Sequence, residues 1–443
     1  MQHENLAGIQ KIKQSIENLV NSGNATEAKE ILKKYKGIFL EDSSWLCATN
    51  AVICILENDY EEAKKQLQHG LESSPFNANL LFNLGYVYEQ LGEHQLAYDY
   101  YIDAEYALNQ NEKKIAKEAL RNIQQLDQKV IKKKAIAFIV KPGMDSFLED
   151  LIKGFKGEYR VKKVVVKETS QIEQAMKWSD VSWFEWCDEL IIYASKTNLA
   201  STRKIICRLH SYEAFTNSIH AVKWTAVDKV IFVAEHIREI VGKQVRINEQ
   251  RMEIVANGIN EEKFKYATRK KGYNIAYVGY INYKKGPMLL LQVIKALVDK
   301  DSRFQLHIAG QFQDIRDQLY FQQMIQEWKL QKNINFHGWQ DDIDKWLEDK
   351  EFLISTSLLE SQQLSIMEAM AKGIKPVIHN FYGAKNIYPS QYVWSTINEA
   401  VEMILENEYD SNEYRGFVQR RYSANDMNNR LLKLIREVVE NEN

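Results

Sequence analysis

The hydrophobic period of this chain changes near residue 134, and this change limits the folds that the chain can adopt. Up to residue 133 the apolar positions recur every three or four residues, as in IENLVNSGNATEAKEILKKY, which is typical of helices. From residue 134 onward, short apolar runs alternate with helix-length polar stretches; the runs are AIAFIV, KKVVVK, DVSWF, KIICRL and KVIFV. A second series starts at Ile254 and contains NIAYVG, FQLHIAG, NINFHG, EFLIST and KPVIHNF. We therefore expect an all-helical segment followed by two doubly wound parallel sheets, an α/β fold.

The helical segment contains an internal repeat. Ala28, Ala63 and Ala97 lie 35 and 34 residues apart, and each follows a turn that contains Gly or Asn. Around Ala97, small and aromatic residues stand where the tetratricopeptide (TPR) pattern has them; these are Leu84, Gly85, Tyr88, Tyr101 and Ala104. The segment thus resembles about two and a half TPR units, with residues 111–133 as a further helix that could cap the stack. Such helices bind peptides, pair subunits into homo-oligomers, or only support a neighbouring domain.

These patterns divide the chain into three domains. We expect a TPR-like domain over residues 1–133, a first Rossmann-like domain over 134–250, and a second Rossmann-like domain with C-terminal helices over 251–443. Ligands of doubly wound sheets bind at the carboxyl ends of the strands, and a cleft between two such domains is the expected site. The loops that follow the apolar runs are therefore the segments in which to seek functional residues.

Composition and charge exclude several classes of protein. The 443 residues include 58 Lys and Arg against 60 Asp and Glu, so the chain lacks the positive charge of a general nucleic-acid binder. No apolar run approaches the ~20 residues that span a bilayer, and the start MQHENLAGIQ lacks the apolar core of a signal peptide, so we expect a cytoplasmic protein. The four cysteines form no CxxC pair and lie in apolar stretches, which predicts reduced, buried thiols.

The segment ESQQLSIMEAMAKG carries the strongest functional pattern. Seven residues separate Glu360 from Glu368, and the second half of the segment reads as a helix. If the helix begins near Gln362, Glu360 projects from the preceding loop, and the two carboxylates can hold different parts of one extended ligand. The N–H groups at the helix start, from Gln363 and Leu364 onward, would bind a diphosphate. An amphipathic helix with two solvated glutamates has the same spacing.

The longer segment ESQQLSIMEAMAKGIKPVI resembles the signature of glycosyltransferase family 4, whose members are retaining enzymes with the GT-B fold. Further similar segments follow in the order of that family: VANGI, YVGYINYKKG, HIAG, FHGW and YGA. The resemblance is strong over about residues 250–400 and weak over 134–250. It implies that the first Rossmann-like domain faces the acceptor and that the second binds a nucleotide sugar.

The resemblance also implies which residues bind the donor. Glu368 matches the glutamate that takes the ribose hydroxyls, Glu360 the one that bonds hydroxyls of the donor sugar, and Lys285 the phosphate-binding lysine. No carboxylate lies within three residues of Lys285 in the sequence, so its ammonium could offset charge on the diphosphate. Gly279 of the VG pair is expected beside the nucleotide sugar. The family commonly has arginine next, where this chain has Tyr280, and a phenol cannot replace a guanidinium fork.

Other matched residues surround the sugar, the base and the acceptor. His210 in KIICRLHSYEAF matches the histidine that the family presents to the donor sugar. The base is expected near His337 and Gly338. On the acceptor side, Gly143 in KPGMDSF matches a short glycine loop, and Glu185 in DVSWFEWCDE ends a predicted strand inside the presumed cleft.

These residues imply a retaining transfer that needs no metal. No Asp or Glu of a matched motif is placed as a covalent nucleophile, so the departing phosphate oxygen would take the acceptor proton on the same face of the sugar. The catalytic residues would be His210, Lys285 and Glu360. Asp342 and Asp344 resemble a DxD metal motif, but they stand before a predicted helix, and we interpret them as capping residues.

The helical repeat suggests a polypeptide acceptor. The main interpretation is therefore transfer from a nucleotide sugar, with UDP commoner than GDP in the family, to Ser or Thr of a protein such as flagellin or an adhesin. A cell-surface polysaccharide or glycolipid is the alternative acceptor, which the basic stretch KGFKGEYRVKKVVVK keeps open. A TPR scaffold with a decayed transferase core is the alternative without catalysis.

Overall fold

The computed structural model describes residues 2–39, 43–109, 113–145 and 148–440 of the chain. The chain separates into two compact units, of which the first contains residues 1–145 and 156–182 and the second residues 146–155 and 183–443. Among the described residues, no helix is long and apolar enough to cross a membrane. The division into three domains at residues 133 and 250 stays a prediction.

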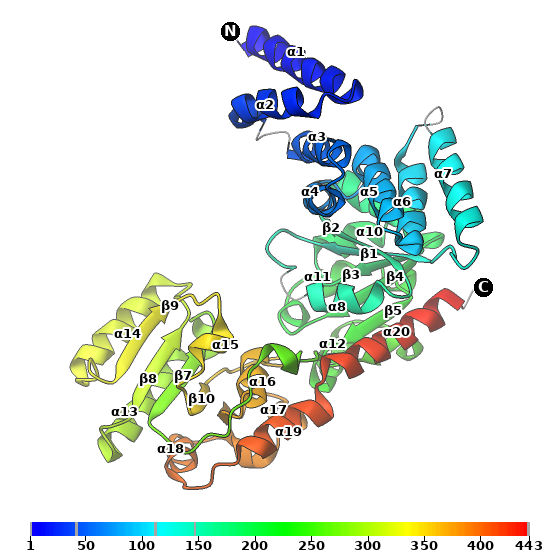
Figure 1. The fold of residues 1–443 in the computed structure, drawn as a ribbon. Helices are drawn as coiled ribbons and strands as arrows, with labels where there is room; N and C mark the ends of the chain where they lie inside the picture. Colours follow the sequence, from blue (N-terminus) through cyan, green and yellow to red (C-terminus); the bar gives the residue numbers. More distant parts are fainter. Residues whose placement is uncertain (1, 40–42, 110–112, 146–147, 441–443) are drawn as a thin grey trace. The chain divides into compact units, whose positions relative to one another are not determined.

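The described residues before 134 form helices and turns, which confirms the predicted all-helical segment (Figure 1). The α-helices are α1 (Gln2–Asn21), α2 (Ala25–Tyr35), α3 (Ser43–Leu56), α4 (Tyr60–Ser73), α5 (Ala78–Gln90), α6 (His94–Ala107) and α7 (Lys113–Leu126). The three alanines of the repeat are fully buried. A Cβ atom on Gly85 would lie 2.8 Å from the ring of Tyr101, so glycine allows α5 and α6 to approach closely. The repeat positions are therefore packing positions.

Two parallel sheets of six strands follow, as the alternating pattern predicts. The strands are β1 (Ala135–Val140), β2 (Arg160–Val165), β3 (Val181–Phe184), β4 (Lys204–Leu209), β5 (Lys229–Phe232), β6 (Met252–Ile254), β7 (Asn274–Val278), β8 (Gln305–Ala309), β9 (Ile334–Gly338), β10 (Phe352–Ser355), β11 (Lys375–His379) and β12 (Val393–Trp394). Among the described residues, the strand orders are β2-β1-β3-β4-β5-β6 and β12-β11-β10-β7-β8-β9.

The strand β6 corrects one expectation. We placed Ile254 at the start of the second series, but β6 pairs with β5 in the first sheet, where Ile254 lies opposite Phe232. A strand of three residues is too short to have a hydrophobic period of its own. Its backbone pairing, which the sequence pattern does not reveal, decides the sheet to which it belongs.

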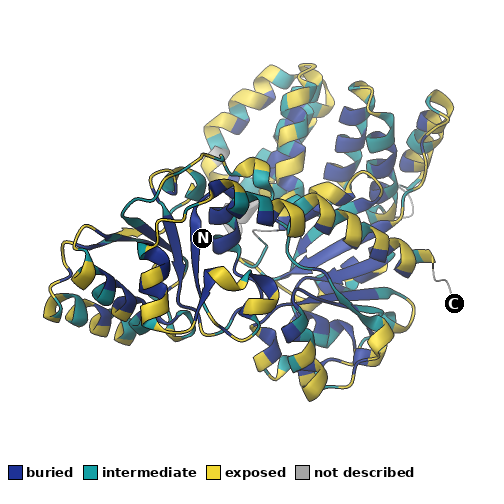
Figure 2. Cartoon of the chain, turned by 90° about the horizontal axis from the view of Figure 1, so that it is seen from below, coloured by how far each residue is buried: buried dark blue, intermediate teal, exposed yellow. Residues whose placement is uncertain are grey.

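Helices cover the sheets and position the loops at the strand ends. The helices are α8 (Leu148–Phe155), α9 (Thr169–Trp178), α10 (Glu189–Ala194), α11 (Ser218–Ala221), α12 (Glu235–Gln244), α13 (Pro287–Lys300), α14 (Ile315–Glu327), α15 (Ile343–Trp346), α16 (Leu364–Ala371), α17 (Ala384–Ile387), α18 (Ile397–Leu405), α19 (Ser411–Arg421) and α20 (Ala424–Glu440). Figure 2 shows buried strands beneath helices that are exposed on one side. In β10, Phe352 and Ile354 face the cluster that contains α13, and Leu353 faces the cluster that contains α16. These two helices therefore cover opposite faces of the second sheet.

A buried charged cluster joins the helical repeat to the first strands. Asp103 of α6 is 6% exposed, and its carboxylate accepts bonds from the guanidinium of Arg160, from Lys162 Nζ at 2.9 Å and from Trp178 Nε1 at 3.0 Å. Burial lowers the pKa of Lys162, whereas the charge of Asp103 raises it. One carboxylate thus neutralises two buried cations of β2, and α6 and β2 form one packed body.

We expect Asp103→Asn to destabilise the first unit by about 3–5 kcal/mol, because it leaves Arg160 and Lys162 buried without a counter-charge. The matched control is Asp145→Asn, which removes a carboxylate 2.8 Å from Lys163 of the same strand, in a pair whose side chains are 25% exposed. That change should cost about 1 kcal/mol or less. Urea unfolding together with hydrogen exchange at β2 measures both. Equal losses in the two variants would contradict the role given to the cluster.

Candidate active site

The loop between β10 and α16 carries both glutamates of the matched motif. β10 ends at Ser355 and α16 begins at Leu364, close to the helix start that the pattern predicts. Glu360 lies in the loop and is 7% exposed, whereas Glu368 lies in the second turn of α16. The two carboxylates therefore belong to different parts of one strand–loop–helix unit.

Lys285 lies in the segment that follows the neighbouring strand β7, and its side chain reaches this loop. It ends the short 3-10 helix Tyr283–Lys285, and the next residue, Gly286, has a φ of 62°. A Cβ atom on Gly286 would lie 2.2 Å from the carbonyl oxygen of Thr356, so only glycine allows the two loops to approach this closely. The hydroxyl of Thr356 donates to the carbonyl oxygen of Lys285 at 2.8 Å and holds the loops together.

This junction brings Lys285 and Glu360 into an ion pair, with Lys285 Nζ 2.5 Å from Glu360 Oε1. The sequence led us to expect an ammonium clear of carboxylates, because none lies nearby in the chain; the fold supplies one from 75 residues away. The side chain of Lys285 is 18% exposed and that of Glu360 is 9% exposed. Both groups thus retain access to a ligand, which could take the ammonium with an anion and the carboxylate with hydroxyl groups.

The start of α16 is open to an anion. Gln363 stands at the N-cap position without a capping bond from its side chain. Its side-chain oxygen instead accepts a bond from the hydroxyl of Ser355, and its carbonyl oxygen accepts one from Tyr388 at 3.3 Å. The N–H groups of the first turn, beginning at Leu364, are therefore uncapped and available to a negatively charged group.

Glu368 is a carboxyl group without a protein partner. Among the described residues, none forms a hydrogen bond or an ion pair with its side chain, and burial raises the pKa of Glu368 to about 7. A half-buried carboxyl without donors is typical of a site where a ligand supplies them.

His236 is a site residue that the sequence analysis missed. It lies in the first turn of α12, and its Nε2 donates to the carbonyl oxygen of Glu360 at 2.8 Å. Its Nδ1 is buried without a partner, and burial lowers the pKa of His236. A Cβ atom on Gly383 would lie 2.4 Å from the ring, so the backbone of the YGA motif packs directly on it. A histidine at a helix start has no periodic signal, so only the fold reveals this contact with Glu360.

His210 and Glu185 meet at the ends of β4 and β3. Glu185 is fully buried; its Oε1 lies 3.0 Å from His210 Nε2, and its Oε2 accepts a bond from Trp183 at 2.8 Å. The ring of Trp186 packs on His210, with 4.4 Å between the ring centroids. We assigned these two residues to different ligands, whereas in the structure the carboxylate orients the imidazole. A contact between Glu185 and an acceptor stays a prediction, and its full burial does not favour one.

Arg208 connects this pair to the loop before α16. It is 1% exposed, one of its terminal nitrogens donates to Asn257 Oδ1 at 2.7 Å, and the other lies 3.5 Å from Glu185. The N–H of Asn257 donates to the side-chain oxygen of Gln362, and the side-chain amide of Gln362 donates back to the carbonyl oxygen of Asn257, both at 2.7 Å. The strand ends of the first sheet and the loop of Glu360 are therefore linked by continuous hydrogen bonds.

The residues expected near the base lie on the far strands of the second sheet. His337 and Gly338 end β9, the edge strand, and both are exposed. His337 Nε2 is 3.0 Å from Nδ1 of His307 on β8, and none of its contacts among the described residues is with either glutamate. Tyr280, which follows β7, packs on Trp339 with 5.0 Å between the ring centroids. Tyr280 thus takes part in an aromatic pair that the sequence analysis did not foresee.

Two predicted glycines have backbone roles in different units. Gly279 has a φ of 133°, and a Cβ atom on Gly310 would lie 1.9 Å from the carbonyl oxygen of Gly279, so the ends of β7 and β8 touch through backbone atoms. Gly143 has a φ of 76° in the turn after β1 and belongs to the first unit. Its predicted contact with an acceptor stays a prediction.

Asp342 and Asp344 are engaged by protein groups. Asp342 accepts a bond from the N–H of Lys345 at 3.0 Å and caps α15, as we interpreted it from the sequence. The same interpretation was wrong for Asp344, which lies within α15 and pairs with the ammonium of Lys372 instead of capping the helix. Across the part of the chain that the structure describes, no three His, Cys, Asp or Glu side chains are grouped so as to hold a metal ion.

Known proteins are similar to parts of this chain. Residues 258–420 match the protein family described as "Glycosyl transferases group 1". The chain is 26% identical over 219 residues to the poly(ribitol-phosphate) alpha-N-acetylglucosaminyltransferase of Staphylococcus aureus (strain COL), across 47% of this chain and 39% of that protein. It is 24% identical over 190 residues to the UDP-Gal:alpha-D-GlcNAc-diphosphoundecaprenol alpha-1,3-galactosyltransferase of Escherichia coli, across 39% of this chain and 48% of that protein. The chain thus spans less than half the length of these two curated relatives.

Solved structures share the arrangement of the two sheets. HepE from Anabaena, in complex with UDP and glucose, is similar with a TM-score of 0.60 and 12% identity, over 69% of this chain and 100% of HepE. A variant of S. aureus TarM, in complex with fondaparinux, alpha-GlcNAc-glycerol and UDP, is similar with a TM-score of 0.50 and 19% identity, over 57% of this chain and 55% of TarM. The chain has the GT-B fold, and its residues 258–420 are similar to the glycosyl transferases group 1 family.

Proposed function

We propose that this protein is a retaining glycosyltransferase that moves a sugar from a UDP-sugar to a polymeric or lipid-linked glycan. The observation that carries the proposal is the convergence on one loop of a lysine, an uncapped helix start and two carboxylates, Glu360 and Glu368. This set offers cations and N–H donors for a diphosphate and acceptors for the hydroxyls on either side of it. UDP is present in the TarM and HepE complexes, which supports UDP as the nucleotide.

Donor binding would exchange the ion pair of Lys285 and Glu360 for contacts with the ligand. In the free protein each group neutralises the other. The diphosphate would take the ammonium together with the N–H groups at the start of α16, and hydroxyls of the donor sugar would take the carboxylate. Glu368, which lacks a protein partner, would accept bonds from the ribose. Because the ion pair already places Lys285 and Glu360 side by side, only their partners need to change when the donor binds.

The transfer itself would proceed on one face of the sugar. The bond between the anomeric carbon and the phosphate oxygen breaks, the acceptor oxygen forms the new glycosidic bond on the same face, and the acceptor proton passes to the departing phosphate oxygen. Lys285 and the helix start would stabilise the charge that grows on the diphosphate. His210, oriented by Glu185, would face the donor sugar, and His236 would fix the backbone of Glu360.

The names of the relatives favour a glycan acceptor over a protein. One relative is named for poly(ribitol phosphate) and the other for a sugar on diphosphoundecaprenol, so both names describe acceptors that contain phosphate. Transfer to Ser or Thr of flagellin or an adhesin has support only from the helical repeat, and we keep it as the second candidate. Assays with the three acceptor types, followed by mass spectrometry, distinguish the candidates.

The roles of the two glutamates predict different effects on nucleotide binding. Glu368→Ala should weaken UDP binding by about 1.5–3 kcal/mol, the range for hydrogen bonds to charged groups. Glu360→Ala should leave UDP binding unchanged or tighter, because it frees Lys285 for the diphosphate, while it weakens binding of the intact UDP-sugar. Calorimetric titration with UDP, GDP and UDP-sugars measures both effects. Equal losses of UDP affinity in the two variants would show that the assignment is wrong.

Lys285→Ala should lower turnover more than donor affinity, on the order of a hundredfold, because the charge on the diphosphate grows toward the transition state. Lys284→Ala, on the neighbouring residue, is the matched control and should change turnover little. Initial rates of sugar transfer at varied donor concentration separate kcat from KM.

The metal-free route also predicts full activity in EDTA. Activity that EDTA abolishes and manganese restores would refute that route.

Glu368 predicts a pH dependence of UDP binding. The pKa of Glu368 lies at about 7, above the ordinary value of a glutamate, so the folded protein without ligand holds the carboxyl proton more tightly than the unfolded chain does. The free energy of unfolding therefore falls as the pH rises through 7. Ribose hydroxyls favour the ionised carboxylate, so UDP affinity should rise about tenfold between pH 6 and pH 8. In Glu368→Gln the phosphate groups of UDP still titrate, but the tenfold rise of UDP affinity between pH 6 and pH 8 should be absent. A wild-type profile identical to that of the variant would contradict the prediction.

A further inference from the structure

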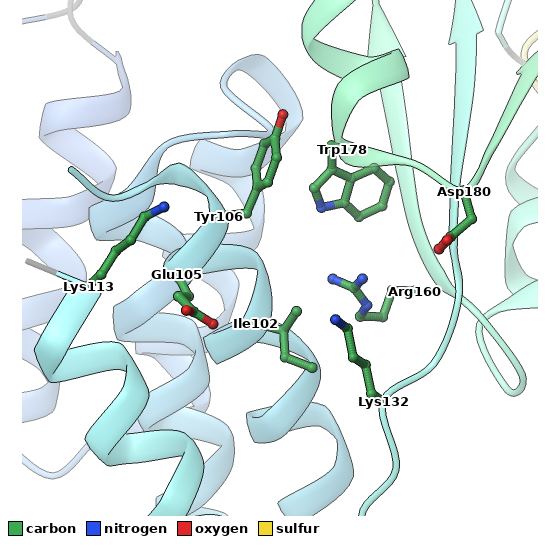
Figure 3. A pocket seen from close by; sticks show the side chains of 8 residues that line it. All are labelled: Ile102, Glu105, Tyr106, Lys113, Lys132, Arg160, Trp178 and Asp180. Atoms are coloured by element: carbon green, nitrogen blue, oxygen red, sulfur yellow. The ribbon is translucent and has the colours of Figure 1, made fainter. Parts of the chain in front are cut away.

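A pocket lies in the first unit, between the helical repeat and the first strands (Figure 3). Its volume is about 310 Å³. The helices α6 and α7 supply Ile102, Glu105, Tyr106 and Lys113, and the strand side supplies Lys132, Arg160, Trp178 and Asp180. None of these residues belongs to the donor site described above.

Three cationic side chains face this pocket, and each has hydrogen-bond donors that could still bind an anion. Across the described residues, the ammonium groups of Lys113 and Lys132 form no ion pair with any carboxylate. The guanidinium of Arg160, a residue 9% exposed, uses Nε for the carbonyl oxygen of Lys133 and one terminal nitrogen for Asp103. Its second terminal nitrogen is therefore available, and Figure 3 shows the guanidinium turned toward the pocket.

The two carboxylates of the lining are already engaged. Asp180 accepts a bond from the N–H of Ala135 at 2.8 Å, and Lys134 Nζ lies 3.6 Å from it. Glu105 lies 3.8 Å from Lys117 Nζ. Each of these carboxylates has a cation of its own outside the lining, and Asp103 already balances Arg160. The ammonium groups of Lys113 and Lys132 therefore keep a positive charge that no carboxylate of the lining balances. Like charges that converge on a pocket without counter-charges repel each other unless an anion joins them.

The shape and chemistry of the pocket favour a phosphodiester. Its volume exceeds that of one phosphate group and leaves room for the polyol units on both sides, which could contact the aromatic residues Tyr106 and Trp178. Ile102 is the one aliphatic side chain of the lining, so the pocket offers no surface for a lipid tail. Two ammonium groups and the remaining terminal nitrogen of Arg160 are suited to phosphate oxygens.

We infer that this pocket binds a phosphodiester group of an anionic acceptor polymer. The inference rests on the proposed function for the identity of the ligand as acceptor. A polymer held here at a second point has a higher effective concentration at the donor site, without any new contact there. The helical repeat would thus contribute to acceptor binding through α6 and α7.

The test compares two double variants with equal changes of charge. Lys113→Ala with Lys132→Ala removes two cations of the pocket, and Lys114→Ala with Lys129→Ala removes two exposed lysines outside it. Calorimetric titration of the full chain with poly(ribitol phosphate) oligomers should show a loss of roughly tenfold or more for the first variant, little change for the second, and a weaker salt dependence for the first. Equal losses would mean that only overall charge matters and would overturn the inference.

Three further measurements separate this inference from the proposed function. Titration with UDP should give the same affinity for the wild type and both variants. If the wild type binds UDP but not the polymer, the inference about the pocket is wrong and the proposed function can still hold. Absence of UDP binding overturns the proposed function. Inorganic phosphate that binds as tightly as the polymer would identify a small-anion site and also overturn the inference. The pocket variant should lose kcat/KM for the polymer, while its hydrolysis of UDP-sugar stays unchanged.

Discussion

The proposed donor site depends on one backbone contact, the approach of Gly286 to the carbonyl oxygen of Thr356. A side chain at residue 286 would force the end of β7 away from the end of β10. The contact lets a lysine and a glutamate separated by 75 residues form one ion pair beside the start of α16. The charges of the site are therefore positioned by a close contact between two backbone segments.

Much of this architecture could be predicted from the sequence, because hydrophobic periods report which residues are buried. The helices before residue 134 and the main strands follow from those periods, and the short strand at Met252–Ile254 does not, because three residues carry no period. The motif around Glu360 and Glu368 likewise predicts a strand–loop–helix unit. Its partners were harder to predict: His236 and the Lys285 pair depend on which loops the fold brings together, and no spacing along the chain encodes that.

Two regions of the chain hold charged groups in opposite ways. In the cluster around Asp103, one carboxylate satisfies two cations and an indole, and the groups are buried almost completely. In the proposed donor site, neither Glu368 nor Nδ1 of His236 has a partner among the residues that the structure describes, and the ion pair of Lys285 stays within reach of solvent. The first arrangement stabilises the fold, and the second leaves polar groups that could bind a ligand.

The cluster around Asp103 also bears on how such a chain could have arisen. A repeat domain that is joined to its neighbour only by a linker could be exchanged between genes without destabilising either domain. Here α6 supplies the counter-charge for two buried cations of β2, so the two sheets transplanted without the repeat would expose that strand with unbalanced charge. A substitution of Asp103 in the helix therefore constrains which residues the strand can carry at 160 and 162.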